Sequence, residues 1–206
     1  MLAGRGRLIL NRGLFSPCLV LLLFSFPGVS TGLAQDRTFT VSAEQSEVVF
    51  SLGDVLHQVH GTFHIQSGTV RFDERSPEMQ GSIVVAAGSG QSGNNTRDRR
   101  MTLDILNAPQ FPEVSFRPRQ MVGSISAIGD SVVQVEGVFT LHGAPHDLTV
   151  PMQIHIGGTT CTAKTRFMIP YVKWGLKDPS TFLLRVDKEV GMEITLVGQL
   201  SSSTLQ

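Results

Sequence analysis

The sequence predicts an all-β protein with one short helix, folded as an extended antiparallel β-barrel of about eight strands. From Phe39 onward, short alternating or apolar runs are separated by turn residues at intervals of about ten, which is the spacing of an antiparallel sheet or barrel. One segment only, from Asn94 to Asn107, has the signals of a helix. Closure into a barrel is expected because it removes the unpaired edges of an open sheet.

Residues 1–34 have the composition of a secretory signal peptide. Three arginines precede an apolar run over residues 14–26, and small residues ending at Ala34 follow it. The run is shorter than the roughly 20 residues of a membrane span, so an uncleaved anchor is the weaker alternative. We therefore expect a secreted or periplasmic protein in which residues 35–206 form one barrel domain.

The expected mature chain is close to neutral and has one cysteine. The whole chain has 17 basic and 17 acidic residues, and removal of the three leader arginines leaves 14 against 17, a net charge of −3. A chain with this charge balance has no overall positive potential that would attract nucleic acid. Cys161 is alone in residues 35–206, so stability is expected to come from a packed core and not from an internal disulfide.

The first half of the barrel is expected to consist of short strands. Val48, Phe50 and Leu52 share one face, because successive side chains of a strand point to opposite sides. A Gly/Ser loop over residues 88–93 delivers the chain to the helix. The strands expected before this loop cover residues 39–41, 47–52, 55–65, 69–73 and 81–87.

The helix is expected to begin at Asn95 and to stop before Pro109. The side chain of Asn95 can accept a backbone N–H bond at the helix start, and Asp98 favours the positive end of the helix dipole. Proline cannot donate a hydrogen bond, and it pushes the residue before it out of the α region. The charged run from Arg97 to Arg100 is either a solvated cap over one end of the sheet or a polar rim at the mouth of a cavity.

The second half again consists of strands. Over residues 131–141, Val135, Gly137 and Phe139 alternate with partly polar neighbours, which is a half-buried pattern. We assign structural roles to Gly137 and to Gly143, which closes the following hairpin. The strands expected in this half cover residues 113–117, 120–128, 131–141, 148–156, 159–169, 171–176 and 190–200.

The inward-facing side chains are aliphatic or aromatic, so an apolar lumen is expected. A barrel of about eight strands has an interior that is filled by side chains or holds one small ligand, and the pattern leaves both open. Trp174, the sole tryptophan, either lines a cavity mouth or packs in the core. The residues expected to line the lumen are Phe50, Leu52, Phe63, Ile83, Val85, Phe116, Phe139, Leu141, Phe167 and Trp174.

Five short motifs follow one another along the chain: Ser46–Phe50, Gly61–Phe63, Asn95–Asp98, Pro112–Phe116 and Gly137–Gly143. They occur in the order seen in YceI-like proteins, and the chain resembles that family over nearly all of residues 38–200. The resemblance implies a lipocalin-like barrel whose lumen binds a long isoprenoid or quinone-like lipid. Many relatives carry His-Leu or His-Met soon after Arg-Asp, where this chain has Arg-Arg-Met.

A polar rim is predicted for the head group of such a lipid. Arg97, Arg99 and Arg100 are suited to pair with a phosphate or to polarise a quinone oxygen, because guanidinium is a bidentate donor. His142 is included in this rim. The alternative for Arg97 and Asp98 is a local salt bridge or a device at the helix start. A membrane enters only as a source of the ligand, and the sequence does not predict the oligomeric state.

The sequence favours a binding protein over an enzyme. Residues 35–206 contain no Gly-x-Ser-x-Gly elbow and no phosphate loop of the Gly-Lys-Ser/Thr type. His57 has the opposite strand parity to His60 and His64, whereas a zinc site needs three or four converging ligands. No cofactor and no metal are expected. Two alternatives stay open: an envelope stress or structural protein with a filled barrel, and a weak metal-dependent enzyme that uses clustered histidines.

Overall fold

The computed structural model describes residues 36–53, 57–73, 76–181 and 185–203. All of them belong to one compact unit, Leu33–Gln206. The expected leader, residues 1–34, lies outside the described residues. None of the described helices is both long enough and apolar enough to cross a membrane.

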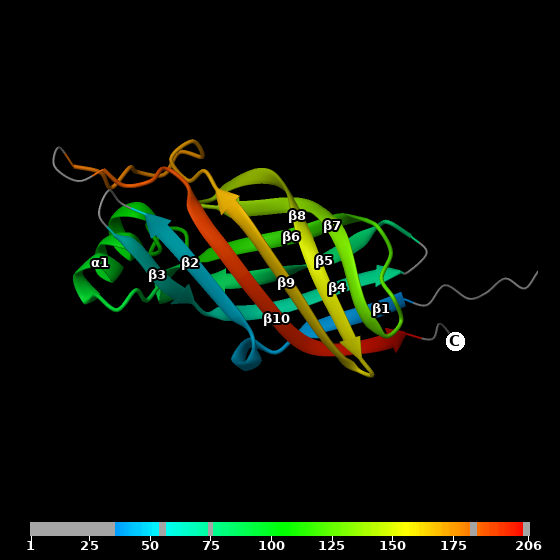
Figure 1. The fold of residues 1–206 in the computed structure, drawn as a ribbon. Coiled ribbons are helices and arrows are strands. Elements are labelled where there is room, and N and C mark those ends of the chain that lie inside the picture. The colour runs from blue at the N-terminus through cyan, green and yellow to red at the C-terminus, as the bar shows by residue number, and fades with distance from the viewer. Residues whose placement is uncertain (1–35, 54–56, 74–75, 182–184, 204–206) are drawn as a thin grey trace, which may run out of the picture. The chain divides into compact units, whose positions relative to one another are not determined.

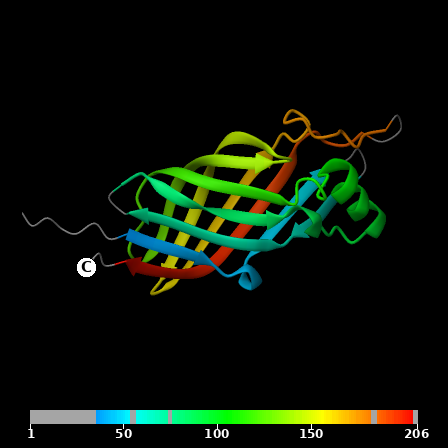
Figure 2. The same ribbon diagram turned by 180° about the vertical axis from the view of Figure 1, so that it is seen from behind.

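The described residues form ten antiparallel strands, and eight of these close into a barrel (Figures 1 and 2). The ring closes because β1 pairs with β4 on one side and with β10 on the other. The sequence-based prediction of a closed barrel of about eight strands is therefore confirmed. The strands are β1 (Asp36–Val41), β2 (Glu47–Gly53), β3 (Gln58–Phe63), β4 (Ile65–Asp73), β5 (Met79–Ala86), β6 (Glu113–Val122), β7 (Gly129–Leu141), β8 (Ala144–Gly157), β9 (Thr160–Ile169) and β10 (Val190–Ser203).

The two further strands, β2 and β3, form a hairpin attached to β10. Residues 198–203 of β10 pair with β1, and residues 191–195 pair with β2. The far edge of β3 is joined to the segment before the helix, because the backbone of Thr62 donates to Gln91 at 2.8 Å and accepts from it at 2.9 Å. The hairpin thus extends the wall of the barrel at the end where the helix lies (Figure 1).

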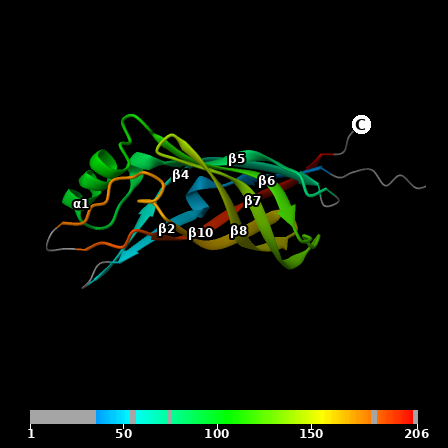
Figure 3. The ribbon, with the colours of Figure 1, turned by 90° about the horizontal axis from the view of Figure 1, so that it is seen from above.

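The helix α1 (Asn95–Arg100) continues into a π-helical turn, η3 (Met101–Ile105), and the helical segment ends before Pro109, as predicted. Its N-cap is Asn94 and not Asn95, because Asn94 Oδ1 accepts the backbone N–H of Arg97 at 3.0 Å. Both asparagines satisfy the sequence rule, so only the geometry separates them. Figure 3 shows α1 at one end of the barrel. Two short 3-10 turns, η1 (Ala43–Gln45) and η2 (Ala87–Ser89), are further helical segments that the sequence analysis did not predict.

Several predicted strands differ from the structure. The strand expected over residues 55–65 is broken at His64, because β3 ends at Phe63 and β4 begins at Ile65 and includes residues 69–73; residues 55 and 56 lie outside the described residues. Residues 171–176 form turns, in which the N–H of Leu176 bonds to the carbonyl of Tyr171 at 3.0 Å and Gly175 has φ +95°. A left-handed residue of this kind does not continue a strand, so the apolar run was misleading. The strands expected over 113–117 and 120–128 form one strand, β6, with a register shift between Pro118 and Gln120; this strand ends at Val122, and residues 123–128 are not part of a strand.

The core of the barrel consists of two clusters of apolar side chains. The larger one fills most of the barrel and includes Val135, Ile154 and Leu196. The second gathers around Phe139 and Tyr171, together with side chains of η3, the segment after β9 and neighbouring strands. The interior of the described barrel is therefore mostly apolar.

Candidate functional site

An apolar cavity of about 50 Å³ lies inside the barrel. Every strand of the eight-membered ring contributes to its wall, together with Ile125 from the connection between β6 and β7. The largest side chains in this wall are three phenylalanines and three methionines: Phe39, Phe72, Phe116, Met79, Met121 and Met152.

The cavity is much smaller than the pockets that hold drug-sized ligands, which are about 300–1,000 Å³. The sequence left open whether the lumen is hollow or filled. In this structure side chains fill most of the lumen, and a small apolar space is left beside Phe39 of β1 and Val70 and Phe72 of β4. A long lipid would therefore have to displace side chains that now occupy the lumen.

The ten predicted lumen residues all lie in or against the apolar core. Ile83 and Phe116 line the cavity. Phe63 and Val85 pack against the larger cluster. Phe50 is 5% exposed, and its ring centroid lies 5.3 Å from that of Phe63. The remaining five belong to, or pack against, the second cluster: Leu52, Phe139, Leu141, Phe167 and Trp174.

Aromatic rings pack around Trp174, which is half-buried in the turn segment after β9. Its indole stacks on the imidazole of His146, with centroids 4.1 Å apart and planes 5° from parallel. The ring of Phe139 lies 5.9 Å from Trp174 and 6.3 Å from Phe167. Of the two interpretations of Trp174, core packing describes its contacts in this structure.

The sequence-based list of lumen residues did not include His146. In the β7–β8 ladder it faces Phe139, so it lies on the inner side of β8. Its Nε2 atom is buried and has no hydrogen-bond partner. The signal was present in the sequence, because His146 has the same strand parity as Leu148 and Val150.

The predicted rim arginines lie on α1, and none of them lines the cavity. Arg97 donates from Nε to Ser92 Oγ at 2.7 Å and from Nη2 to the Ser92 carbonyl at 2.8 Å. Asp98 Oδ1 accepts both the backbone N–H of Ser92, at 2.9 Å, and its hydroxyl. Arg97 and Asp98 therefore tie the preceding loop to the helix start, which is the local role that the sequence left as an alternative. Arg99 is exposed, Arg100 Nη2 lies 3.5 Å from the Pro179 carbonyl, and a head-group role for these arginines stays a prediction.

His142 and Gly143 form the two-residue turn between β7 and β8. Their φ values are +52° and +75°, as a type I′ hairpin requires. The His142 ring lies 4.3 Å from that of Phe111, and a Cβ added to Gly143 would come within 2.6 Å of the same ring. A Cβ on Gly137 would come within 2.5 Å of the Arg117 carbonyl. Both glycines thus occupy positions where a side chain does not fit without rearrangement.

Sequence reasoning also missed a Gly-x-Gly-x-x-Gly spacing at Gly88, Gly90 and Gly93, which follows β5 and precedes α1. In nucleotide-binding folds this spacing connects a strand of a parallel sheet to a helix. Here β5 pairs antiparallel with both neighbours, and α1 has six residues. A Cβ on Gly90 would collide with the side chains of Met101 and Phe63, so this glycine serves close packing of the helix.

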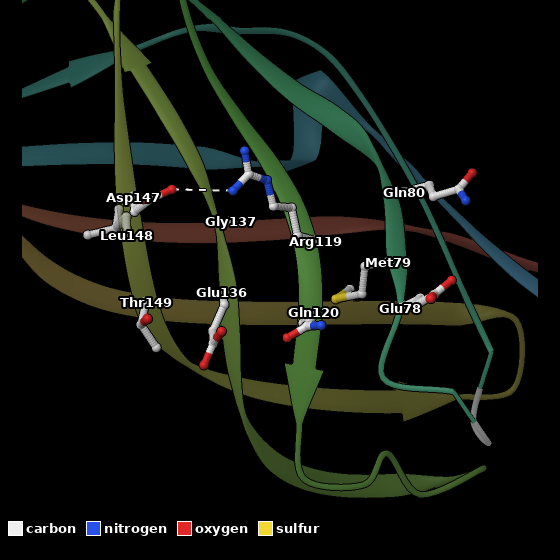
Figure 4. A pocket seen from close by; sticks show the side chains of 10 residues that line it. All are labelled: Glu78, Met79, Gln80, Arg119, Gln120, Glu136, Gly137, Asp147, Leu148 and Thr149. Atoms are coloured by element: carbon white, nitrogen blue, oxygen red, sulfur yellow. Dashed lines mark hydrogen bonds and ion pairs between the residues drawn. The ribbon is translucent and has the colours of Figure 1, made fainter.

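A second hollow lies on the outside of the barrel. It is an open groove of about 690 Å³ across β5 to β8, and Figure 4 shows the side chains that line it. Arg119 Nη1 lies 3.4 Å from Asp147 Oδ1, but the two side chains are 66% and 89% exposed, so the pair contributes little. Glu78 and Glu136 add charge of one sign beside this pair. The groove is open to solvent and lined by charged side chains of both signs, so it does not suit an apolar ligand. The lumen is therefore the candidate site.

The groups that suggested metal or nucleophilic chemistry do not converge. His57, His60 and His64 are all exposed. Within the described parts of the chain, no three His, Cys, Asp or Glu residues are grouped so that they could hold a metal ion. Burial raises the pKa of Cys161 to about 11, against a smaller opposing effect of the charge of Arg37, so this thiol is protonated at neutral pH and packs as a small apolar residue.

Similarity to known proteins agrees with this architecture. A YceI-like domain is matched over residues 39–198. The chain is 24% identical over 121 residues to a UPF0312 protein of Pseudomonas savastanoi pv. phaseolicola, a match that covers 57% of this chain and 61% of that protein. A UPF0312 protein of Pseudomonas fluorescens is 24% identical over 143 residues, or 66% of this chain and 72% of that protein. The chain thus spans about 61% of the length of the first of these relatives.

Solved structures show the same fold. Burkholderia cenocepacia BcnA superposes with a TM-score of 0.63 at 20% identity, over 77% of this chain and 99% of that one. A polyisoprenoid binding domain from Saccharophagus degradans, implicated in plant cell wall breakdown, has a TM-score of 0.58 at 14% identity, over 79% and 98%. The closed barrel, its apolar lumen and the domain match over residues 39–198 lead to one assignment: the chain belongs to the YceI-like family.

Proposed function

We propose that this protein binds and carries a long-chain isoprenoid or quinone-like lipid in the barrel lumen and does not transform it. The observation that carries the proposal is the cavity, whose wall is built from apolar side chains of all eight ring strands. The polyisoprenoid binding domain among the structurally similar proteins supports the same class of ligand.

Hydrophobic burial is the main driving force for such binding. A lipid that buries on the order of 500 Å² of apolar surface gains about 12 kcal/mol at about 25 cal/mol per Å². Association and ordering cost about 4–15 kcal/mol, so micromolar affinity is reached when this cost lies near its lower end. The gain needs no polar contact.

Binding requires the lumen to widen from about 50 Å³. The wall contains Met79, Met121 and Met152, whose unbranched side chains have three rotatable bonds and adapt to irregular space. We propose that these methionines move aside as the lipid enters. The rings of Phe39 and Phe72 then stay in place, and the hydrocarbon chain of the lipid packs against them.

The test is a titration of delipidated protein with a dispersed polyprenol, followed through the fluorescence of Trp174. Because this single tryptophan stacks on His146 and packs against the apolar cluster around Phe139, a lipid that fills the lumen is expected to change its emission in a saturable way. The variant M152F places a larger, stiffer side chain in the cavity wall and should weaken lipid binding by narrowing the lumen. Absence of a saturable change, together with absence of lipid that co-elutes with the protein, would reject the proposal.

A filled barrel without a ligand is the alternative that the small cavity favours. In that case a structural or stress-related role in the cell envelope would follow, and delipidation would leave stability unchanged. A carrier, by contrast, is stabilised by its ligand through mass action. Thermal unfolding with and without polyprenol separates these two functions.

We further propose that the protein acts outside the cytoplasm after removal of residues 1–34. The support is the arginine-rich start and the apolar run of this segment. Protein purified from its native source should begin at Gln35. A native chain that retains Met1 would reject export by a cleaved leader.

A further inference from the structure

We propose that Thr165 selects the ligand, and that the lumen holds a lipid whose uncharged hydroxyl or carbonyl oxygen lies deep inside the barrel. This inference rests on the proposed function and adds a specificity-determining residue to it. It also places the polar atom of the lipid in the interior, away from the arginines of α1.

Thr165 stands out in a mostly apolar interior. Its side chain is 8% exposed, and among the residues whose burial is described it is the one polar residue in the buried class. The hydroxyl oxygen Oγ1 is inaccessible to solvent and has no hydrogen-bond partner. A buried hydroxyl without a partner destabilises a protein, whereas valine has nearly the same shape and avoids this cost.

Thr165 follows the cavity-lining residues of β9 along the inner face of the barrel. Cys161, Ala163, Thr165 and Phe167 alternate with more exposed neighbours along β9, so they share the inner face of the barrel. Cys161 and Ala163 line the cavity. The hydroxyl of Thr165 therefore comes next along the lumen, before Phe167.

The neighbouring strand gives the same placement. Ala163 pairs with Leu196 and Thr165 pairs with Ile194 in the β9–β10 ladder. Leu196 lines the cavity, and Ile194 packs against the larger core cluster. A linear lipid that extends from the cavity along the barrel passes the Thr165 hydroxyl.

The chemistry of the hydroxyl defines the class of ligand. Threonine offers one donor and two acceptor lone pairs, so it can bond to a lipid hydroxyl or to a carbonyl. A phosphate at this depth would need a cation beside it. Arg37, the cation whose charge lowers the pKa of Cys161, lies toward the other end of the barrel, because it pairs with Ser202 of β10 whereas Thr165 pairs with Ile194. We therefore expect the oxygen bonded to Thr165 to be uncharged.

The experiment compares two probes, geranylgeraniol and the hydrocarbon of equal chain length that lacks the hydroxyl. Delipidated wild-type protein should bind the alcohol about tenfold more tightly, which corresponds to about 1.4 kcal/mol. T165V should bind both probes alike, and T165S, which keeps the hydroxyl, should restore the preference. Thr162→Val, on the other face of β9, is the matched control and should behave as wild type.

The outcomes separate this inference from the proposed function. If neither probe binds to any variant, the proposed function fails. If both bind equally well to wild-type protein, or if T165V keeps the preference for the alcohol, the role of Thr165 is rejected while lipid binding stands. Unliganded T165V should unfold at a temperature no lower than wild type. If the valine variant fails to fold, T165A replaces it in the comparison of alcohol and hydrocarbon binding.

Discussion

Filling the cavity with a larger side chain should stabilise the empty barrel and weaken lipid binding. Ala163 is 5% exposed and lines the cavity. Ala163→Val adds two methyl groups that point into this space, and valine is favoured in strands. The substitution therefore distinguishes a lumen that must accommodate a ligand from one that only has to be packed.

The magnitude follows from the size of the cavity. At about 24 cal/mol per Å³, a cavity of about 50 Å³ costs the folded state about 1.2 kcal/mol. Filling it should raise the free energy of unfolding by about 1 kcal/mol, which is about 2–4 °C in Tm for a domain of this size. Ala87 is the matched control, because it is 1% exposed and does not line the cavity. Ala87→Val should destabilise the protein by about 1–3 kcal/mol through overpacking.

Urea unfolding of delipidated protein measures the stability change, and titration with polyprenol measures the change in binding. We expect the Ala163 variant to be more stable and to bind polyprenol at least tenfold less tightly. A loss of stability comparable to that of the Ala87 variant would show that the space beside Ala163 is absent. A gain in stability with unchanged affinity would place the lipid outside the lumen.

Three further predictions concern the turn, the helix cap and the buried thiol. Gly143→Ala should lower the free energy of unfolding by about 1–3 kcal/mol, because a Cβ at φ +75° would meet the ring of Phe111. Gly158→Ala, at φ +67° with no atom within 4 Å of the added Cβ, should lower it by about 1 kcal/mol or less. Equal losses in urea unfolding would refute the packing argument. Asn94→Ala should cost about 1 kcal/mol and Asn95→Ala much less, and the reverse order in thermal unfolding would place the cap at the second asparagine. The pKa of Cys161 is raised to about 11 from 9.0, so native protein should resist a thiol reagent at pH 8. Its stability should fall as pH rises from 9 to 11, because the folded state holds the thiol proton more tightly than the unfolded chain. Rapid labelling of the folded protein at pH 8 would contradict this.

Local patterns were sufficient to predict most of the strands. In β7 the side chains of Val133, Val135, Phe139 and Leu141 are all buried, as their alternation indicates. The positive φ values at the following hairpin agree with the turn chemistry around Gly143. These features depend on neighbours in the sequence, and a single chain contains the information for them.

Features that depend on distant contacts were harder to predict. The ring closes where residues 198–203 meet β1, more than 150 residues away, and periodicity does not specify that register. Residues 171–176 have the apolar pattern of a strand, but they fold as turns that place Trp174 on His146. The hydroxyl of Thr165 stands out only after its burial and its lack of a partner are known.

The most direct measurement is mass spectrometry of the organic extract from protein purified out of its native source without added lipid. An isoprenoid or quinone-like species near one molecule per protein, depleted in the Ala163→Val variant, is the predicted result. Protein that elutes free of any lipid, or that carries only diacyl lipids in proportions matching the membrane, would contradict the idea that this lumen is a lipid-carrying site.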